Sequence, residues 1–183
     1  MNREGLKKNL KSYRTPFEEE KTFIQEFVDL TDDPMAFLRD RKEGHFTASA
    51  WIVNKTRTHT LLTHHKKLNR WLQLGGHADG NENLMEVAMT EAKEESGLIS
   101  LKLVDTYIFD IDKHIIPANE KVPQHYHYDV RFLVEAAMDE PLTVSAESKD
   151  LAWVSYDAVP DVVGSNDSII RMLEKTSKSE LVH

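Results

Sequence analysis

Apolar and polar positions alternate along this chain in two different periods, and each period predicts one kind of element. Residues 45–53 and 58–64 read as two strands joined by a short polar turn, which predicts a hairpin. Residues 125–134 alternate strictly, with aromatic and aliphatic side chains on one face and mostly His, Asp and Arg on the other. Residues 101–111 are rich in β-branched and aromatic side chains and predict one long strand, and residues 151–154 predict a short one.

Helical periodicity marks the two ends of the chain. The first 14 residues are polar and are expected to be loosely structured, whereas residues 16–30 carry an apolar stripe that predicts a helix. A short helix is expected around residues 35–38, and one helical turn at 156–159. The last predicted helix follows Ser165 as its cap.

The order of these elements predicts an α/β fold. Strands, a helix, further strands and a helix favour a mixed sheet between helices, with a helical extension at the N-terminus. We therefore expect an extension at residues 1–42 and a second, main domain at 43–183. The extension could pack on the main domain, mediate formation of a homodimer or cover the site.

One predicted helix has acidic residues where an apolar stripe should continue. On a helical wheel, Glu91, Glu94 and Glu95 extend the stripe that begins at Leu84. An amphipathic helix normally keeps its charges opposite the core, and like charges four residues apart destabilise a helix. The pattern therefore predicts a site for a hard divalent cation such as Mg²⁺, which binds carboxylates together with substrate phosphates. A solvated Glu-rich helix is the alternative interpretation.

The predicted ends of this helix are marked by polar caps and glycines. Asp79 with Glu82 is typical of a capping box, and Asn81 is an equally good N-cap. Gly97 fits a left-handed C-cap. The preceding pair Gly75-Gly76 predicts a turn whose backbone can approach a ligand closely or adopt positive φ.

The segment from Gly76 to Leu98 resembles the Nudix box, whose pattern is G-x5-E-x7-R-E-U-x-E-E-x-G-U with U aliphatic. The fixed positions are matched by Gly76, Glu82, Glu91, Glu94, Glu95, Gly97 and Leu98, with Ala92 at the first aliphatic position. The resemblance extends over about residues 45–160. It implies an α/β/α sandwich and hydrolysis of a nucleoside diphosphate linked to another group, with Mg²⁺ or Mn²⁺.

The resemblance also implies roles for particular residues. Glu91, Glu94 and Glu95 would be metal ligands or the base, and the Gly75 carbonyl a further ligand. Separately, Glu147 lies in a loop that could supply another acid, either as ligand or as base, although a solvated loop Glu is an equal alternative. We predict substrate contacts from Gly75, Gly76, His77 and Arg131. In the resulting mechanism, Glu91 or Glu147 takes the proton from an attacking water.

One box position departs from the family, because Thr90 stands where the family has Arg. That Arg commonly pairs with the Glu at position 82, and Lys93 lies about 16 Å further along the helix than Glu82, too far to replace it. Either another cation steadies a looser acidic cluster, or the domain binds nucleotides without hydrolysing them and acts as a regulatory module. A diphosphate isomerase is disfavoured, because the best-known ones use a Cys that this chain lacks.

Nine His residues leave several functional readings open. His125 and His127 share a strand face with Asp129 and Arg131, and with a third ligand they could form a zinc site. A polar pocket wall or a solvated sheet face is the alternative. Arg131 is the best phosphate contact of this group, although strand arginines more often form structural ion pairs.

The composition of the chain limits the kinds of molecule that it is expected to bind. Lys and Arg number 23 and Asp and Glu 31, so the net charge of −8 disfavours a broad nucleic-acid surface. The absence of Cys fits a reducing cytoplasm. No apolar run reaches the ~20 residues that a membrane span needs. We therefore expect a cytoplasmic protein that acts on a small nucleotide or diphosphate compound.

Overall fold

The computed structural model describes residues 1–120 and 122–179, so residue 121 and the last four residues of the predicted main domain lie outside it. The chain divides into two compact units, which we describe separately. Unit 1 comprises Met1–Ser49, Gly75–Ala88 and Thr106–Phe132, and unit 2 comprises Ala50–Leu74, Met89–Asp105 and Leu133–His183. Four elements contribute residues to both units: β1 (Gly44–Asn54), β4 (Leu74–His77), α3 (Leu84–Ser96) and β7 (His125–Ala136).

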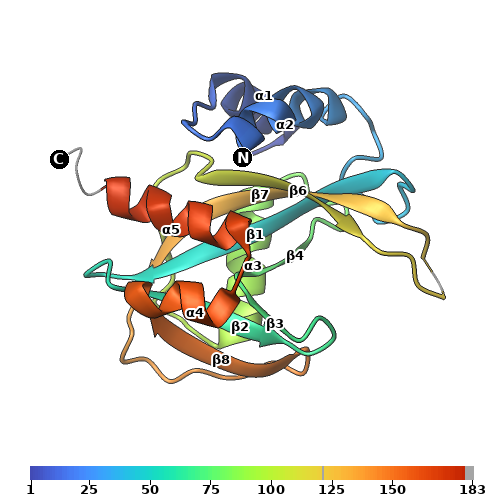
Figure 1. Cartoon of the computed structure of the whole chain (residues 1–183). Coiled ribbons are helices and arrows are strands. Elements are labelled where there is room, and N and C mark those ends of the chain that lie inside the picture. Colours follow the sequence, from blue (N-terminus) through green and yellow to red (C-terminus); the bar gives the residue numbers. More distant parts are fainter. Residues whose placement is uncertain (121, 180–183) are drawn as a thin grey trace. The chain divides into compact units, whose positions relative to one another are not determined.

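Unit 1 begins with two helices that lie side by side, α1 (Arg3–Ser12) and α2 (Glu18–Leu30) (Figure 1). The expectation of loose structure in the first 14 residues is therefore wrong. Asn2 caps α1 by accepting a hydrogen bond from the Gly5 backbone at 3.0 Å, and Leu6 and Leu10 are fully buried. Two leucines four residues apart give an otherwise polar helix an apolar edge.

A buried carboxylate fastens α2 to the strand β6 (Asp110–Ile116). Glu20 is fully buried and accepts hydrogen bonds from the Tyr13 hydroxyl at 2.6 Å and the Ile111 backbone N–H at 3.1 Å. The short helix expected at 35–38 is replaced by turns. There the Asp33 side chain accepts from the Met35 N–H at 2.8 Å and so competes with helical hydrogen bonds.

The strands of unit 1 are built around β7. Strand β6 pairs with it in antiparallel register from Asp110↔Arg131 to Ile116↔His125. On its other side β7 neighbours β1, which also pairs with β4 (Leu74–His77). The long strand expected at 101–111 is wrong: the chain forms β6 and the two-residue β5 (Lys102–Leu103), which belongs to unit 2. Between them Tyr107 is 69% exposed, so this stretch lacks a buried face that would hold it as a strand.

Gly75 lies where β4 approaches β1 most closely, and we predict that a side chain there destabilises the fold. A Cβ at this position would lie 2.4 Å from Ser49 Oγ and 2.6 Å from the Ala48 carbonyl. Gly75→Ala should cost about 1–3 kcal/mol, as overpacking does elsewhere, and lower the melting temperature. The matched control is Gly5→Ala, where the nearest atom belongs to the flexible Met1 side chain. Equal melting temperatures for both variants would contradict the prediction.

Unit 2 is built around β2 (His59–His65). This strand pairs in antiparallel fashion with β1, β3 (Arg70–Leu72) and β8 (Ser148–Ser155), which confirms the predicted hairpin. The core of this unit consists of aliphatic residues from strands, α3 and the loops, namely Ala50, Ile52, Leu61, Leu74, Ala92, Leu98, Val134, Ala136 and Leu151.

Three short helical elements complete unit 2: η1 (Tyr156–Ala158), α4 (Val159–Val163) and α5 (Asp167–Ser179). Asn166, not the predicted Ser165, caps α5 by accepting from the Ile169 N–H. The fully buried Trp51 donates from Nε1 to Thr176 Oγ1 at 2.8 Å and so ties α5 to β1. Among the described residues, no helix is both long and apolar enough to cross a membrane.

Candidate functional site

Helix α3 carries the three acidic residues, and its ends are partly as predicted. Gly97 follows the helix with φ of 75°, which confirms the left-handed C-cap. The N-cap is Asn83, whose Oδ1 accepts a hydrogen bond from the Glu86 backbone N–H at 3.4 Å. The two predicted N-caps, Asp79 and Asn81, are therefore wrong. Asp79 instead pairs with Arg39, and Asn81 accepts from the Asn83 N–H at 2.9 Å.

The glutamates differ in their exposure. Glu91 and Glu95 lie one turn apart on one helix face and are half-buried, beside the fully buried Ala92. Glu94 is exposed. Two carboxylates on one half-buried face, with a third beside them, offer the hard oxygen ligands that Mg²⁺ prefers. The residues present therefore fit a divalent cation.

Glu147 lies in an exposed turn directly before β8 in unit 2. Its backbone carbonyl accepts a hydrogen bond from the Lys66 N–H at 2.9 Å. Burial lowers the pKa of the neighbouring His65, and the charge of Glu147 opposes this shift. Glu147 is thus a solvent-accessible carboxylate, and its catalytic role stays a prediction.

Gly75, Gly76 and His77 form part of strand β4 in unit 1, where a turn was predicted. Neither glycine has positive φ, so the conformational argument for this pair is wrong. The close packing on β1 explains Gly75, because a side chain would collide with the neighbouring strand. The predicted contacts of these three residues with substrate stay predictions.

A cation does meet Glu82, and it comes from the N-terminal helix. Within unit 1, Nε and Nη2 of Arg3 lie 3.0 and 2.9 Å from Glu82 Oε1. The same guanidinium lies 5.0 Å from the Phe37 ring centroid and donates to the Asp33 carbonyl at 3.1 Å. Arg3 therefore supplies to Glu82 the guanidinium partner that is absent at Thr90.

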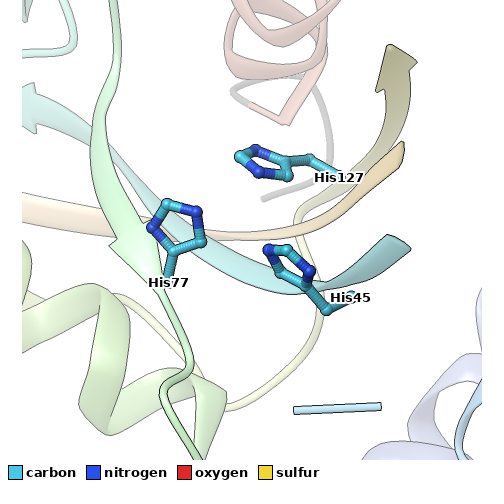
Figure 2. A group of neighbouring side chains, drawn as sticks. All are labelled: His45, His77 and His127. Carbon is cyan, nitrogen blue, oxygen red and sulfur yellow. The ribbon is translucent and has the colours of Figure 1, made fainter. Parts of the chain in front are cut away.

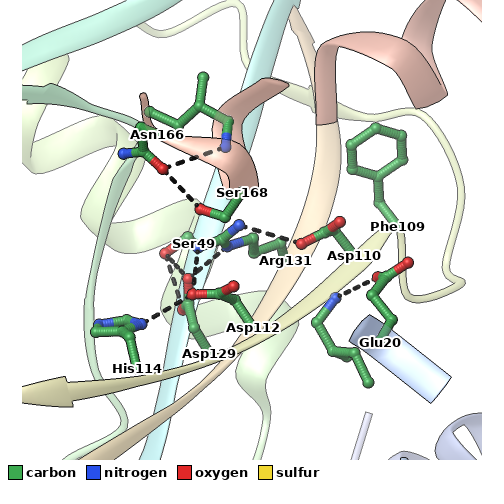
Figure 3. Close-up of polar contacts among 12 residues, drawn as sticks. Glu20, Ser49, Phe109, Asp110, Asp112, His114, Asp129, Arg131, Asn166 and Ser168 are labelled. Carbon is green, nitrogen blue, oxygen red and sulfur yellow. Dashed lines mark hydrogen bonds and ion pairs between the residues drawn. The ribbon is translucent and has the colours of Figure 1, made fainter. Parts of the chain in front are cut away.

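Arg131 is enclosed by carboxylates in unit 1 (Figure 3). The residue is 2% exposed, and its guanidinium lies 3.1, 3.3 and 2.7 Å from Asp110, Asp112 and Asp129. Burial alone would lower its pKa, but Asp112, Asp129 and Asp110 outweigh burial and raise it. Arg131 thus forms structural ion pairs, which was the alternative interpretation of this residue. Its predicted contact with a substrate phosphate stays an untested prediction.

Several His residues gather in unit 1 (Figure 2). The rings of His45 on β1, His77 on β4 and His127 on β7 have centroids 4.8–5.3 Å apart. The predicted His125 is also near, with its ring centroid 5.2 Å from those of His45 and His127. Burial and neighbouring charges lower the pKa of His77 to about 4 and that of His127 to about 2. Burial therefore disfavours the charged form of His45, His77 and His127 alike.

Sequence reasoning missed four participants in these clusters. His45 stands near the start of a strand and has no other His beside it in the sequence. Asp110 and Asp112 alternate along β6 as Asp129 and Arg131 do along β7, and that parallel period was a usable signal. Arg3 lies in a segment that was predicted to be loosely structured. The only signal for it was Thr90, because an arginine missing from the box implied that Glu82 needs another cation as its partner.

Comparison with known families gives a match over most of the chain. The model of the NUDIX domain matches residues 44–173. Among curated proteins, none is similar enough to this chain to count as a match.

Similar solved structures cover about three quarters of the chain. A structure titled a hydrolase of the NUDIX family from Clostridium perfringens is 25% identical, with a TM-score of 0.58, over 76% of this chain and 98% of that one. A C. elegans Ap4A hydrolase binary complex is 17% identical, with a TM-score of 0.60, over 75% and 98%. The E. coli dihydroneopterin triphosphate pyrophosphohydrolase is 15% identical, with a TM-score of 0.56, over 70% and 92%. These likenesses confirm the predicted α/β fold class.

Proposed function

The chain belongs to the Nudix family and is a Nudix-type pyrophosphohydrolase, and we propose that it is metal-dependent and cleaves the diphosphate linkage of a nucleoside diphosphate derivative or a nucleoside triphosphate. The observation that carries this proposal is the pair Glu91 and Glu95 on one half-buried face of α3, with Glu94 beside it. Similarity to an Ap4A hydrolase and to a dihydroneopterin triphosphate pyrophosphohydrolase supports a phosphate-anhydride substrate.

In this proposal the three glutamates of α3 hold Mg²⁺, or Mn²⁺ in its place. The ion would supply Lewis acidity to the diphosphate, which weakens the bond to the leaving phosphate. Glu91 or Glu147 accepts the proton of the attacking water. Glu147 suits this task because it is exposed and free to return the proton to solvent. Arg131 holds no phosphate in this scheme, since three aspartates occupy its guanidinium.

A screen of diphosphate compounds tests the function. The whole chain is incubated with nucleoside triphosphates, dinucleotides, nucleotide sugars and capped RNA, with Mg²⁺ or with EDTA, and the products are identified by mass. We expect cleavage between two phosphorus atoms in at least one class, and none in EDTA. Tight nucleotide binding with no product from any class would refute the proposal and favour the regulatory alternative that Thr90 suggests.

We further propose that Arg3 positions the segment that leads into α3. The pair of Arg3 and Glu82 is partly exposed, at 23% and 42%, so its loss should cost about 0.5–1 kcal/mol. If this loss falls wholly on the transition state, Arg3→Met lowers kcat about two- to fivefold. A double-mutant cycle of Arg3→Met with Glu82→Gln measures the coupling between these two side chains. Additive effects of the two changes on kcat would contradict the proposed positioning role.

Two further variants complete this test. Lys8→Ala, an exposed change on the same helix, should leave kcat unchanged. Thr90→Arg restores the arginine of the family's box and should recover rate in the Arg3→Met background. Melting temperatures of all variants separate a loss of positioning from a loss of folded protein.

A further inference from the structure

We propose that His45, His77 and His127 form a binding site for one Zn²⁺ ion, distinct in chemistry from the carboxylates of α3. The proposal goes beyond the hydrolase function and assigns to His77 a metal rather than a substrate. All three residues belong to unit 1, one each from β1, β4 and β7. Figure 2 shows their rings turned toward a common centre.

The first argument is distance. One nitrogen of each ring lies within 4.8 Å of the others. Three nitrogens bound to a tetrahedral Zn²⁺ at 2.0–2.1 Å lie roughly 3.3 Å apart. Side-chain rotations that move each ring by about 1 Å therefore complete the site, without a change in the strands. The strands themselves are held by the pairing of β7 with β1 and of β1 with β4.

The second argument is the lack of hydrogen-bond partners. His45 is only 2% exposed, yet within residues 1–120 and 122–179 neither of its ring nitrogens makes a hydrogen bond of normal geometry. The same holds for Nε2 of His127. Buried polar nitrogens are normally paired, and an unpaired one in a native protein calls for an explanation such as an ion. A shared metal ion would give each of these rings a partner.

The third argument is chemical selectivity. Burial and the nearby His125 lower the pKa of His45, while a contact with the Arg41 backbone opposes the shift. Burial likewise lowers the pKa values of His77 and His127. Neutral imidazoles bind Zn²⁺ and related transition metals, whereas Mg²⁺ prefers oxygen.

Two more histidines border the cluster. His125 has its ring centroid 5.2 Å from that of His127, and its Nδ1 lies 2.9 Å from the Pro123 carbonyl, which leaves Nε2 for a fourth ligand position. The His114 ring centroid lies 5.5 Å from that of His127, and its Nδ1 lies 3.0 Å from Asp112. Three imidazoles from three strands would bind the ion only in the folded state, so Zn²⁺ should stabilise unit 1.

Zinc titration of the whole chain tests this site. Protein stripped with EDTA and then freed of chelator is titrated with Zn²⁺ by calorimetry in excess Mg²⁺, which occupies oxygen sites. Because the chain has no Cys, thiolates cannot contribute. We expect one Zn²⁺ per chain, a rise in melting temperature, and at least tenfold weaker binding in His77→Gln and in His127→Gln. His59→Gln, outside the cluster, is the matched control and should bind as the wild type does.

A second readout keeps the test independent of how the variants fold. In wild-type protein, the imidazole ¹⁵N resonances of His45, His77 and His127 should shift on addition of Zn²⁺, and those of His59 should not. Co²⁺ in place of Zn²⁺ should give the visible absorption of a tetrahedral site. Absence of stoichiometric Zn²⁺ binding, or unchanged binding in both cluster variants, would overturn the proposal.

Discussion

Glu95→Gln should reduce Mg²⁺-dependent turnover by about 10²- to 10³-fold, because several kcal/mol of transition-state stabilisation come from a held metal ion. Gln keeps the size and polarity of the side chain but removes the charge that a hard cation needs. Glu95 shares a half-buried helix face with Glu91, so its carboxylate cannot be replaced by the exposed Glu94 without a change in the helix. The measurement is kcat/KM on the best compound of the screen.

The control is Glu86→Gln, the same change on the same helix at an exposed residue. Its carboxylate contacts the Asn83 side chain at 3.3 Å and belongs to no predicted site, so its rate should equal that of the wild type. A Mg²⁺ titration adds a second criterion, since loss of a ligand should raise the metal concentration needed for half-maximal rate. Full activity of Glu95→Gln at low Mg²⁺ would remove the basis of the metal assignment.

Arg131→Met should be the most destabilising single change of this protein that we predict. Three carboxylates would lose their cation, and of these Asp110 is fully buried and Asp129 2% exposed. Removal of one partner from a buried ion pair typically costs about 3–5 kcal/mol. For a chain of this size that corresponds to a fall in melting temperature of about 6–20 °C. Figure 3 shows the cluster, in which the Ser49 hydroxyl also donates to Asp129.

Arg70→Met is the matched control, because Arg70 is an exposed strand arginine whose loss should change stability by less than about 0.5 kcal/mol. Asp110→Asn in the Arg131→Met background should restore part of the stability, since it removes one buried negative charge that has lost its Arg131 guanidinium. A variant Arg131→Met with wild-type melting temperature and a raised KM would contradict this account and support the phosphate contact predicted from the sequence.

Elements with a strong period were predictable from the sequence, and elements held by distant contacts were not. Strands β1, β2 and β7 have regular apolar positions, and each lies within two residues of its predicted bounds. Helix α3 ends at Ser96, directly before the predicted C-cap Gly97. Helix α1 has only two buried apolar residues, Leu6 and Leu10, so its local signal was weak. The segment 101–111 gave the opposite error, a strand that was predicted but does not form over its whole length. Its apolar composition suggested a buried strand, but several of these side chains are exposed.

The chemical clusters were predictable only where the box pattern lies. The spacing of Glu91, Glu94 and Glu95 is local to one helix, so the sequence displays it directly. Arg3 and Glu82 are 79 positions apart, and His45 and His127 are brought together by neighbouring strands. Such partners depend on the register and order of strands, which periodicity alone does not determine.

The most direct test of the metal-dependent mechanism is a crystal structure of the whole chain with Mn²⁺ and a non-hydrolysable diphosphate analogue of the best substrate. We expect an anomalous peak at metal–ligand distance from carboxylate oxygens of at least two among Glu91, Glu94 and Glu95, with the ion also bound to an oxygen of the analogue. A bound analogue whose phosphates meet no ion, with those three carboxylates in contact with solvent alone, would contradict the central claim.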